Sequence, residues 1–278
     1  MLNINFVTPR NWLFSILISV ILFTVTPFSQ LEAVASTLFF YNPESNINDF
    51  RALKKLFDTH LANNGSYQFQ PFDEENIFED FVKKNKNDVF LLSSWHYQNL
   101  LSKGYTNLKP ILVGTINGDT TYTKVLSTKK TIGHIKKLKG KRIASAASKD
   151  YTNNMLETMV IQQPIHFKVL TVPKDIDALM SVLFGMAQGA LTTQNSLNAL
   201  ANINPKKYRL VHQIAESQPI MLPVVVAYTS AQFSNDELIN AIENLPISAT
   251  GKEILGMLGW NGWKKITLLE IQELKSAN

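Results

Sequence analysis

The sequence predicts a mixed α/β protein of two lobes, in which parallel sheets are covered by helices on both faces. Short apolar segments rich in aromatic and β-branched residues alternate with segments of helical periodicity along most of the chain. Residues 36–278 also exceed the length of a typical single domain, so we expect two lobes. In sheets of this kind, ligands bind beyond the carboxyl ends of the strands.

The first 35 residues predict export. Arg10 precedes an apolar run over residues 12–23, and small residues follow at 33–36, which is the pattern of a signal peptide cleaved after Ala35. The apolar run is shorter than the roughly 20 residues of a membrane span. An uncleaved N-terminal anchor is the alternative. Because the chain has no cysteine, a lipid-modified cysteine at the junction is excluded, and we expect a periplasmic protein without a lipid anchor.

Strand and helix signals alternate in the first half of the mature chain. Leu53, Leu56, Phe57 and Leu61 recur at helical spacing, and the Asn-Asn-Gly run that follows stops this helix. The other predicted helices cover residues 74–84 and 95–103. The predicted strands cover residues 37–41, 67–72, 88–92 and 108–115.

The second half continues the alternation. Extended segments are predicted at residues 122–127, 142–144, 166–170, 190–192, 208–213 and 223–228. Helices are predicted at residues 132–137, 153–162, 176–184 and 196–201, and the tail from Asn235 reads as largely helical.

Composition and motifs exclude several kinds of chemistry. Without cysteine there is no disulfide, thiolate metal site or cysteine nucleophile. The five histidines form no close pair at metal-ligand spacing, and no G-x-S-x-G or glycine-rich phosphate loop occurs. The basic cluster at residues 136–142 lacks interleaved aromatics, so it is read as a solvated surface. We therefore expect no enzyme, no metal, no cofactor and no nucleic-acid partner, while the net charge of +5 is compatible with an anionic ligand.

Polar and aromatic residues follow several predicted strands, where the ligand site of such a fold would lie. Hydroxyls, amides and rings near helix N-termini suit a small polar or anionic ligand, although each taken singly is also an ordinary cap or turn residue. The candidates of this kind are Tyr41, Tyr97, Tyr122, Ser148, Thr152 and Gln194.

Four segments resemble those of bacterial substrate-binding proteins of ABC transporters. Residues 131–144 (TIGHIKKLKGKRIA) carry the LKGKR piece that is typical of the superfamily. Residues 88–97 (DVFLLSSWHY), 185–197 and 256–263 (GMLGWNGW) resemble segments of its phosphate/phosphite/phosphonate-binding (PhnD-like) branch, in the same order along the chain.

This resemblance implies a type 2 periplasmic-binding-protein (Venus-flytrap) fold with two hinge crossover strands, at residues 122–127 and 223–228. Lobe one would comprise residues 36–126 and 223–278, and lobe two residues 127–222. The protein would be a monomer that captures a small anionic or zwitterionic solute, with a phosphonate-like oxyanion as the first expectation, and delivers it to an ABC permease. Binding would close the lobes.

The anion cradle of the family is altered in this chain. The family's Ser-Thr-Ser-Gly-Tyr segment aligns with residues 147–152, where Ser148 alone keeps a hydroxyl in register and Asp150 adds a negative charge. The family's acidic residue for an amino group aligns with Thr193 or Gln194, whereas Tyr97 matches an aromatic position. A periplasmic sensor or accessory protein for a membrane receptor, and an enzyme on the same scaffold, are therefore the alternative functions.

Overall fold

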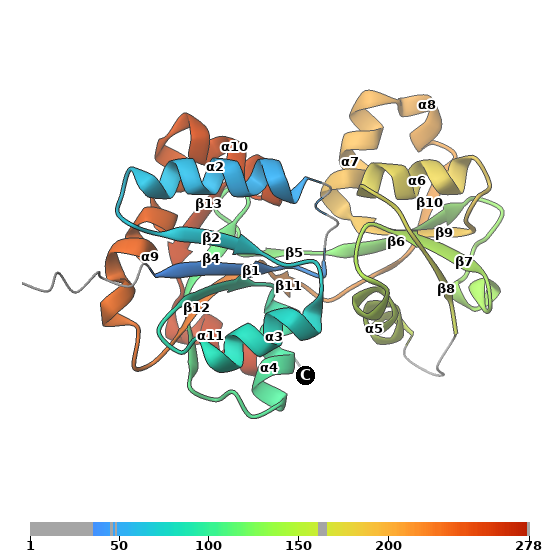
Figure 1. Cartoon of the computed structure of the whole chain (residues 1–278). Helices are drawn as coiled ribbons and strands as arrows, with labels where there is room; N and C mark the ends of the chain where they lie inside the picture. Colours follow the sequence, from blue (N-terminus) through green and yellow to red (C-terminus); the bar gives the residue numbers. More distant parts are fainter. Residues whose placement is uncertain (1–35, 45–46, 48, 161–165, 277–278) are drawn as a thin grey trace, which may run out of the picture. The chain divides into compact units, whose positions relative to one another are not determined.

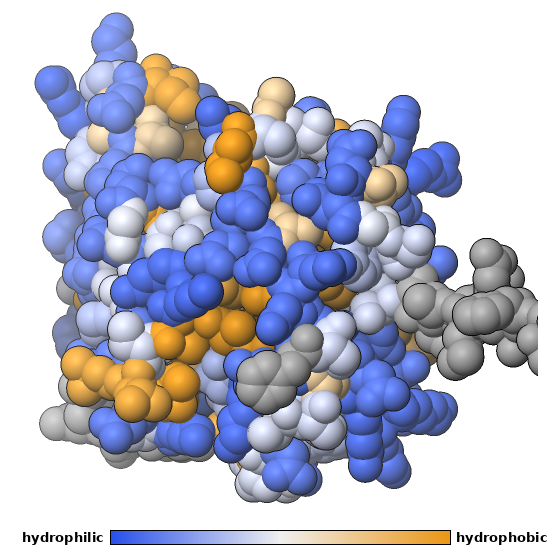
Figure 2. Space-filling view, turned by 90° about the vertical axis from the view of Figure 1, so that its left-hand side faces the viewer, coloured by the Kyte–Doolittle hydropathy of each residue, from blue (hydrophilic) through white to orange (hydrophobic). Residues whose placement is uncertain are grey.

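The computed structural model describes residues 36–44, 47, 49–160 and 166–276. The predicted signal peptide and residues 161–162 of the predicted helix 153–162 lie outside the described residues. None of the described helices is long and apolar enough to cross a membrane. On the face in Figure 2, hydrophilic side chains predominate and hydrophobic ones gather in separate patches.

A six-stranded sheet forms the centre of the first lobe. Its order is β13-β4-β12-β3-β1-β2, in which β1 pairs in parallel with β2 and β3, while β12 and β13 are antiparallel to their neighbours. The strands are β1 (Thr37–Tyr41), β2 (Gln68–Pro71), β3 (Val89–Leu92), β4 (Leu108–Thr115), β12 (Val224–Tyr228) and β13 (Gly262–Lys265). All residues of β3 and β12 are buried, as expected for strands covered on both faces.

Helices cover both faces of this sheet (Figure 1). One face packs on α2 (Phe50–Ala62), α9 (Asp236–Glu243) and α10 (Ala249–Leu258). The other face packs on α3 (Glu75–Lys84), α4 (Ser94–Ser102) and α11 (Leu268–Ser276). Aromatic rings fill much of the core, for example Phe57 stacked on Phe69 with centroids 3.9 Å apart.

A five-stranded sheet forms the second lobe, in the order β10-β6-β9-β7-β8. The strands are β6 (Lys124–Lys129), β7 (Arg142–Ser145), β8 (Lys168–Thr171), β9 (Gly189–Thr193) and β10 (Val211–Glu216). Side chains of α6 (Asp175–Leu183) and α7 (Gln194–Ile203) belong to one of its cores, and those of α5 (Lys149–Met159) to the other. The short helix α8 (Pro205–Tyr208) follows α7.

The chain passes between the two sheets twice, through a small two-stranded ribbon. β5 (Thr121–Tyr122) pairs antiparallel with β11 (Ile220–Met221). The segments that we predicted as crossing strands continue from this ribbon: residues 124–127 lie in β6 of the second sheet and residues 224–228 form β12 of the first. Short 3-10 helices complete the fold at η1 (Ile135–Leu138), η2 (Phe233–Asn235) and η3 (Leu245–Ile247).

The structure confirms the predicted fold class and corrects several element boundaries. Helix α5 begins at Lys149, four residues before the predicted start, because Ser148 caps it although its first turn lacks apolar periodicity. Strand β13 interrupts the tail that we predicted to be largely helical. Its residues carry no alternation of long apolar side chains, so only the pairing with β4 reveals the strand.

Candidate functional site

A cavity of about 400 Å³ lies between the two lobes, beyond the carboxyl ends of their parallel strands. The first lobe contributes Glu44, which follows β1, and Trp260. The second lobe contributes Ala146 after β7, Pro173 after β8 and Thr193 at the end of β9. The cavity therefore lies beyond the carboxyl ends of the strands, where we expect the ligand site of such a fold.

A buried carboxylate lies at this edge of the first sheet. Glu44 is 5% exposed, and the Tyr122 hydroxyl donates a hydrogen bond to its carboxylate. Oη of Tyr151 lies 3.2 Å from Oη of Tyr122. Burial raises the pKa of Glu44, although hydrogen bonds from Tyr122, Ser93 and the Trp95 N–H, together with the charge of Lys124, favour the ionised form.

A buried lysine lies beside this carboxylate. Lys124, at the start of β6, is 3% exposed, and its ammonium group donates to the backbone oxygen of Glu44 at 3.3 Å. The same ammonium lies 5.6 Å from the ring centroid of Tyr122 and 5.8 Å from that of Tyr151, within cation–π range. We call Glu44, Tyr122, Lys124 and Tyr151 the cavity cluster.

The second lobe adds an acidic group to the cavity wall. Asp175, at the start of α6, accepts the backbone N–H of Thr193 at 2.7 Å and the Ser196 hydroxyl at 3.2 Å. Thr193 caps α7 through its side chain. These bonds fix Asp175 at the cavity, because Thr193 and Ser196 lie at the rigid junction of β9 and α7.

Trp260 lines the cavity and carries a hydrogen-bond donor that the chain does not use. Its Nε1–H is buried and has no hydrogen-bond partner among the described residues. Gly259 ends α10 with a φ of +92°, a backbone conformation that side chains disfavour, and so sets the position of the indole. A buried indole N–H without a partner is suited to donate to a ligand oxygen.

Of the predicted site residues, Tyr122 lines this cavity, whereas Ser148 and Thr152 lie at the start of α5 and are not among the lining residues. Tyr122 belongs to the cavity cluster. Ser148 caps α5 by accepting the N–H of Tyr151, and its own N–H donates to the backbone oxygen of Pro43 in the other lobe. Thr152 is fully buried, and its hydroxyl donates to Ser145 at the end of β7. Asp150 is exposed on the first turn.

The other three predicted site residues lie elsewhere. Tyr97 is fully buried in the first lobe and donates its hydroxyl to the Leu108 backbone oxygen, because its position on α4 faces the sheet; burial raises its pKa to about 12. Tyr41 packs its ring against Phe78 and His96. Gln194 pairs with Asn198 and lines a neighbouring cavity of about 300 Å³, which shares Tyr122 and Thr193 with the larger one.

The sequence patterns did not single out Glu44, Lys124, Asp175 or Trp260 as site residues, whereas they placed Tyr151 among the polar residues at a helix start. Glu44 lies in a segment that resembles a simple turn, and Lys124 lies within a strand. Glu44 and Lys124 share the burial of a charged side chain, which sequence patterns do not reveal. The cavity lining in the described part of the chain includes the carboxylates of Glu44 and Asp175 and no histidine.

Several solved structures share the fold at low sequence identity. PhnD1 from Prochlorococcus marinus, in complex with methylphosphonate, superposes with a TM-score of 0.59 at 17% identity, covering 86% of this chain and 96% of its own. A binding protein component of an ABC phosphonate transporter from Pseudomonas aeruginosa has a TM-score of 0.59 at 12% identity, covering 87% and 86%. XAC2383 from Xanthomonas citri, bound to ATP, has a TM-score of 0.62 at 11% identity, covering 87% and 96%.

No curated protein matches the chain in sequence. A family model does match, over residues 37–270, and its description is an ABC transporter, phosphonate, periplasmic substrate-binding protein. The match spans nearly all the described residues, from β1 to α11. The chain therefore belongs to the family of periplasmic phosphonate substrate-binding proteins of ABC transporters.

Proposed function

We propose that this chain captures a small zwitterionic phosphonate in the cavity between its lobes and delivers it to an ABC permease. The observation that carries the proposal is the presence of buried charges of both signs at one cavity. Glu44 and Lys124 are each at most 5% exposed, and both line it. A ligand with an oxyanion at one end and a protonated amine at the other would complement them.

The balance of charge favours a zwitterion over a simple anion. The charged residues of the lining are Glu44 and Asp175, which are acidic, and Lys124 and Lys174, which are basic. A phosphonate without an amine would bring its charge close to the Glu44 carboxylate, where burial weakens screening by water. An amine on the ligand turns that repulsion into attraction.

The hydrogen-bonding groups suit the two ends of such a ligand. The ammonium group of Lys124 and the indole N–H of Trp260 are donors for phosphonate oxygens. Glu44 and Asp175 are acceptors for an amine. A volume of about 400 Å³ lies in the range of small-molecule sites.

The lining supports binding without catalysis. The Ser196 hydroxyl lies 2.8 Å from that of Thr193 and donates to Asp175, so no histidine or lysine base activates it. We further propose that residues 1–35 act as a cleaved signal peptide and that the mature chain works as a monomer.

Thermal unfolding with three matched probes tests the ligand class. The probes are 2-aminoethylphosphonate, ethylphosphonate and ethylamine. We expect the largest stabilisation from the zwitterion, about 2.7 kcal/mol at a hundredfold excess over its Kd, and much smaller shifts from the other two. The Glu44→Gln variant should lose most of the response to 2-aminoethylphosphonate and respond to ethylphosphonate at least as strongly as the wild type.

Two outcomes would contradict the proposal. Equal shifts with 2-aminoethylphosphonate and ethylphosphonate would show that the amine is not recognised. No shift with either phosphonate would exclude this ligand class, while the fold and the family would stand.

A further inference from the structure

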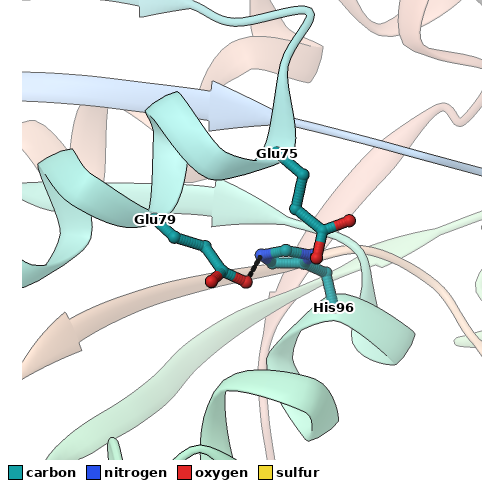
Figure 3. A group of neighbouring side chains, drawn as sticks. All are labelled: Glu75, Glu79 and His96. Atoms are coloured by element: carbon teal, nitrogen blue, oxygen red, sulfur yellow. Dashed lines mark ion pairs between the residues drawn. The ribbon is translucent and has the colours of Figure 1, made fainter.

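A group of side chains on α3 and α4 brings together three groups that commonly bind metals. Glu75 and Glu79 lie four residues apart on α3, and both project toward the ring of His96 at the start of α4 (Figure 3). Oε1 of Glu79 is 3.4 Å from Nε2 of His96, and Oε1 of Glu75 is 3.9 Å from Nδ1. One ligand atom from each residue lies within 4.8 Å of the others.

The histidine of this group is buried and its nitrogens are not satisfied. The His96 side chain is 0% exposed, and its ring packs edge-on against Tyr41 with centroids 5.1 Å apart. Neither ring nitrogen has a hydrogen-bond partner among the described residues. Buried polar groups are almost always paired, so two unpaired nitrogens facing carboxylates call for a further partner.

A metal ion binds the lone pair of a neutral imidazole. A neutral imidazole has one N–H and one lone pair. Next to a carboxylate, a lone pair is repelled unless a cation lies between them.

A positive charge already lies between the two carboxylates. Nζ of Lys103 is 2.6 Å from Oε1 of Glu79 and 3.6 Å from Oε1 of Glu75. The Lys103 side chain is 46% exposed, so its ammonium group can move into water without being buried elsewhere. The two carboxylates are thus placed to hold a cation, and the ammonium group of Lys103 that now lies between them can be exchanged for another.

We propose that Glu75, Glu79 and His96 bind a divalent first-row transition metal, with Zn²⁺ as the representative ion. Zinc bonds of about 2.1 Å to nitrogen and oxygen place neighbouring tetrahedral ligands about 3.4 Å apart. The distance from Glu79 to Nε2 of His96 has that value, while Glu75 lies nearer the other ring nitrogen, at 3.9 Å from Nδ1, and one ligand atom of each residue lies within 4.8 Å of the others. Magnesium and calcium prefer oxygen ligands alone, so the imidazole selects against them.

The bound ion would join α3 to α4 and leave the solute cavity unchanged. Glu75, Glu79 and His96 are not among the residues that line the cavity. The site therefore adds a second binding activity to the first lobe, and its test is independent of the proposed solute.

Calorimetry with Zn²⁺ and absorption spectroscopy with Co²⁺ test the site in the purified protein without a histidine tag. We expect one ion per chain and a visible Co²⁺ band that Zn²⁺ abolishes and excess Mg²⁺ does not. His96→Gln should weaken Zn²⁺ binding about tenfold or more. His212→Gln, which changes an exposed histidine on β10, should leave it unchanged. Lys103→Gln should tighten binding about threefold or more, because it removes the competing ammonium.

Each contrary result overturns the proposal. No binding of Zn²⁺ by the wild type would exclude the site, and equal binding by His96→Gln would assign the ion to surface carboxylates. Circular dichroism checks that His96→Gln folds. If that variant does not fold, Lys103→Gln provides the test instead. Unchanged or weaker Zn²⁺ binding by Lys103→Gln would contradict a metal site at the position of its ammonium group.

Discussion

Two clusters in this protein combine acidic side chains with a lysine, and they differ in how the lysine is held. In the cavity cluster, Lys124 is 3% exposed and Glu44 is 5% exposed. In the group on α3 and α4, which we call the α3–α4 cluster, the Lys103 side chain is 46% exposed and that of Glu75 is 31% exposed. Lys124 is therefore a permanent part of the cavity lining, whereas Lys103 is a counter-ion that a bound cation could replace.

The clusters also differ in which polar atoms the chain satisfies. Tyr122 donates to one carboxylate oxygen of Glu44, and Tyr151 lies within hydrogen-bond distance of Tyr122, whereas Oε1 of Glu44 is buried without a hydrogen-bond partner among the described residues. Both ring nitrogens of His96 lack such a partner among the described residues. In the cavity cluster the chain therefore holds the carboxylate and leaves one oxygen for a ligand, whereas in the α3–α4 cluster it leaves the whole imidazole without a hydrogen bond.

The largest expected effect comes from removing the buried lysine of the cavity cluster. Lys124→Met deletes the hydrogen bond to the Glu44 backbone oxygen and leaves the buried carboxylate without its nearby cation. We expect the free energy of unfolding to fall by about 2–3 kcal/mol. Urea denaturation measures it, and Lys129→Met, at the exposed end of β6, is the matched control with a change below about 0.5 kcal/mol. If Lys124→Met unfolded with the same free energy as the wild type, the contacts of Lys124 with Glu44 would not contribute to stability.

The neighbouring residues Tyr97 and His96 of α4 should differ in how much their substitution lowers the stability, and the larger of the two effects is of intermediate size. Tyr97→Phe removes a hydroxyl that donates to Leu108, and it should cost about 1 kcal/mol. His96→Phe replaces a ring whose nitrogens have no hydrogen-bond partner among the described residues, and in EDTA it should change stability by less than about 0.5 kcal/mol. Both values come from urea denaturation. A larger loss for His96→Phe than for Tyr97→Phe would show that the chain itself satisfies the histidine.

The smallest expected effect is a pH dependence from Glu44. Its pKa in the folded protein is raised above the ordinary 4.5, so the folded state binds the proton more tightly than the unfolded state. The stability of the wild type relative to Glu44→Gln should therefore rise as the pH falls through the folded pKa toward 4.5, and be constant below that range. Urea denaturation between pH 4 and 8 measures this difference. A slope of opposite sign would mean that the hydrogen bonds and the nearby cation of Glu44 outweigh its burial.

The order of elements could be predicted because hydrophobic periodicity is local. Strands β1 and β4 have the predicted bounds, since each is an apolar run ended by a turn. Helix α5 was predicted to start too late, because a cap such as Ser148 determines a helix start without any apolar signal. Strand β13 was missed because its position depends on pairing with β4, far away in the sequence.

The site was less accessible to sequence reasoning than the fold. Tyr122 was predicted, but its partner Glu44 is 78 residues away and the two meet only when the lobes pack. Tyr97 was chosen as an aromatic residue that follows a strand, yet its position on α4 directs the side chain into the core of the first lobe. The spacing of Glu75 and Glu79 was visible as an i, i+4 pair, whereas the approach of His96 from another helix was not.

The affinity ratio of 2-aminoethylphosphonate to ethylphosphonate, measured by calorimetry on the wild-type protein, tests the central claim most directly. The two compounds differ by the amine that Glu44 and Asp175 are expected to hold. We expect the amine to strengthen binding about tenfold or more, which corresponds to about 1.4 kcal/mol. Equal affinity for both compounds, or tighter binding of ethylphosphonate, would contradict it.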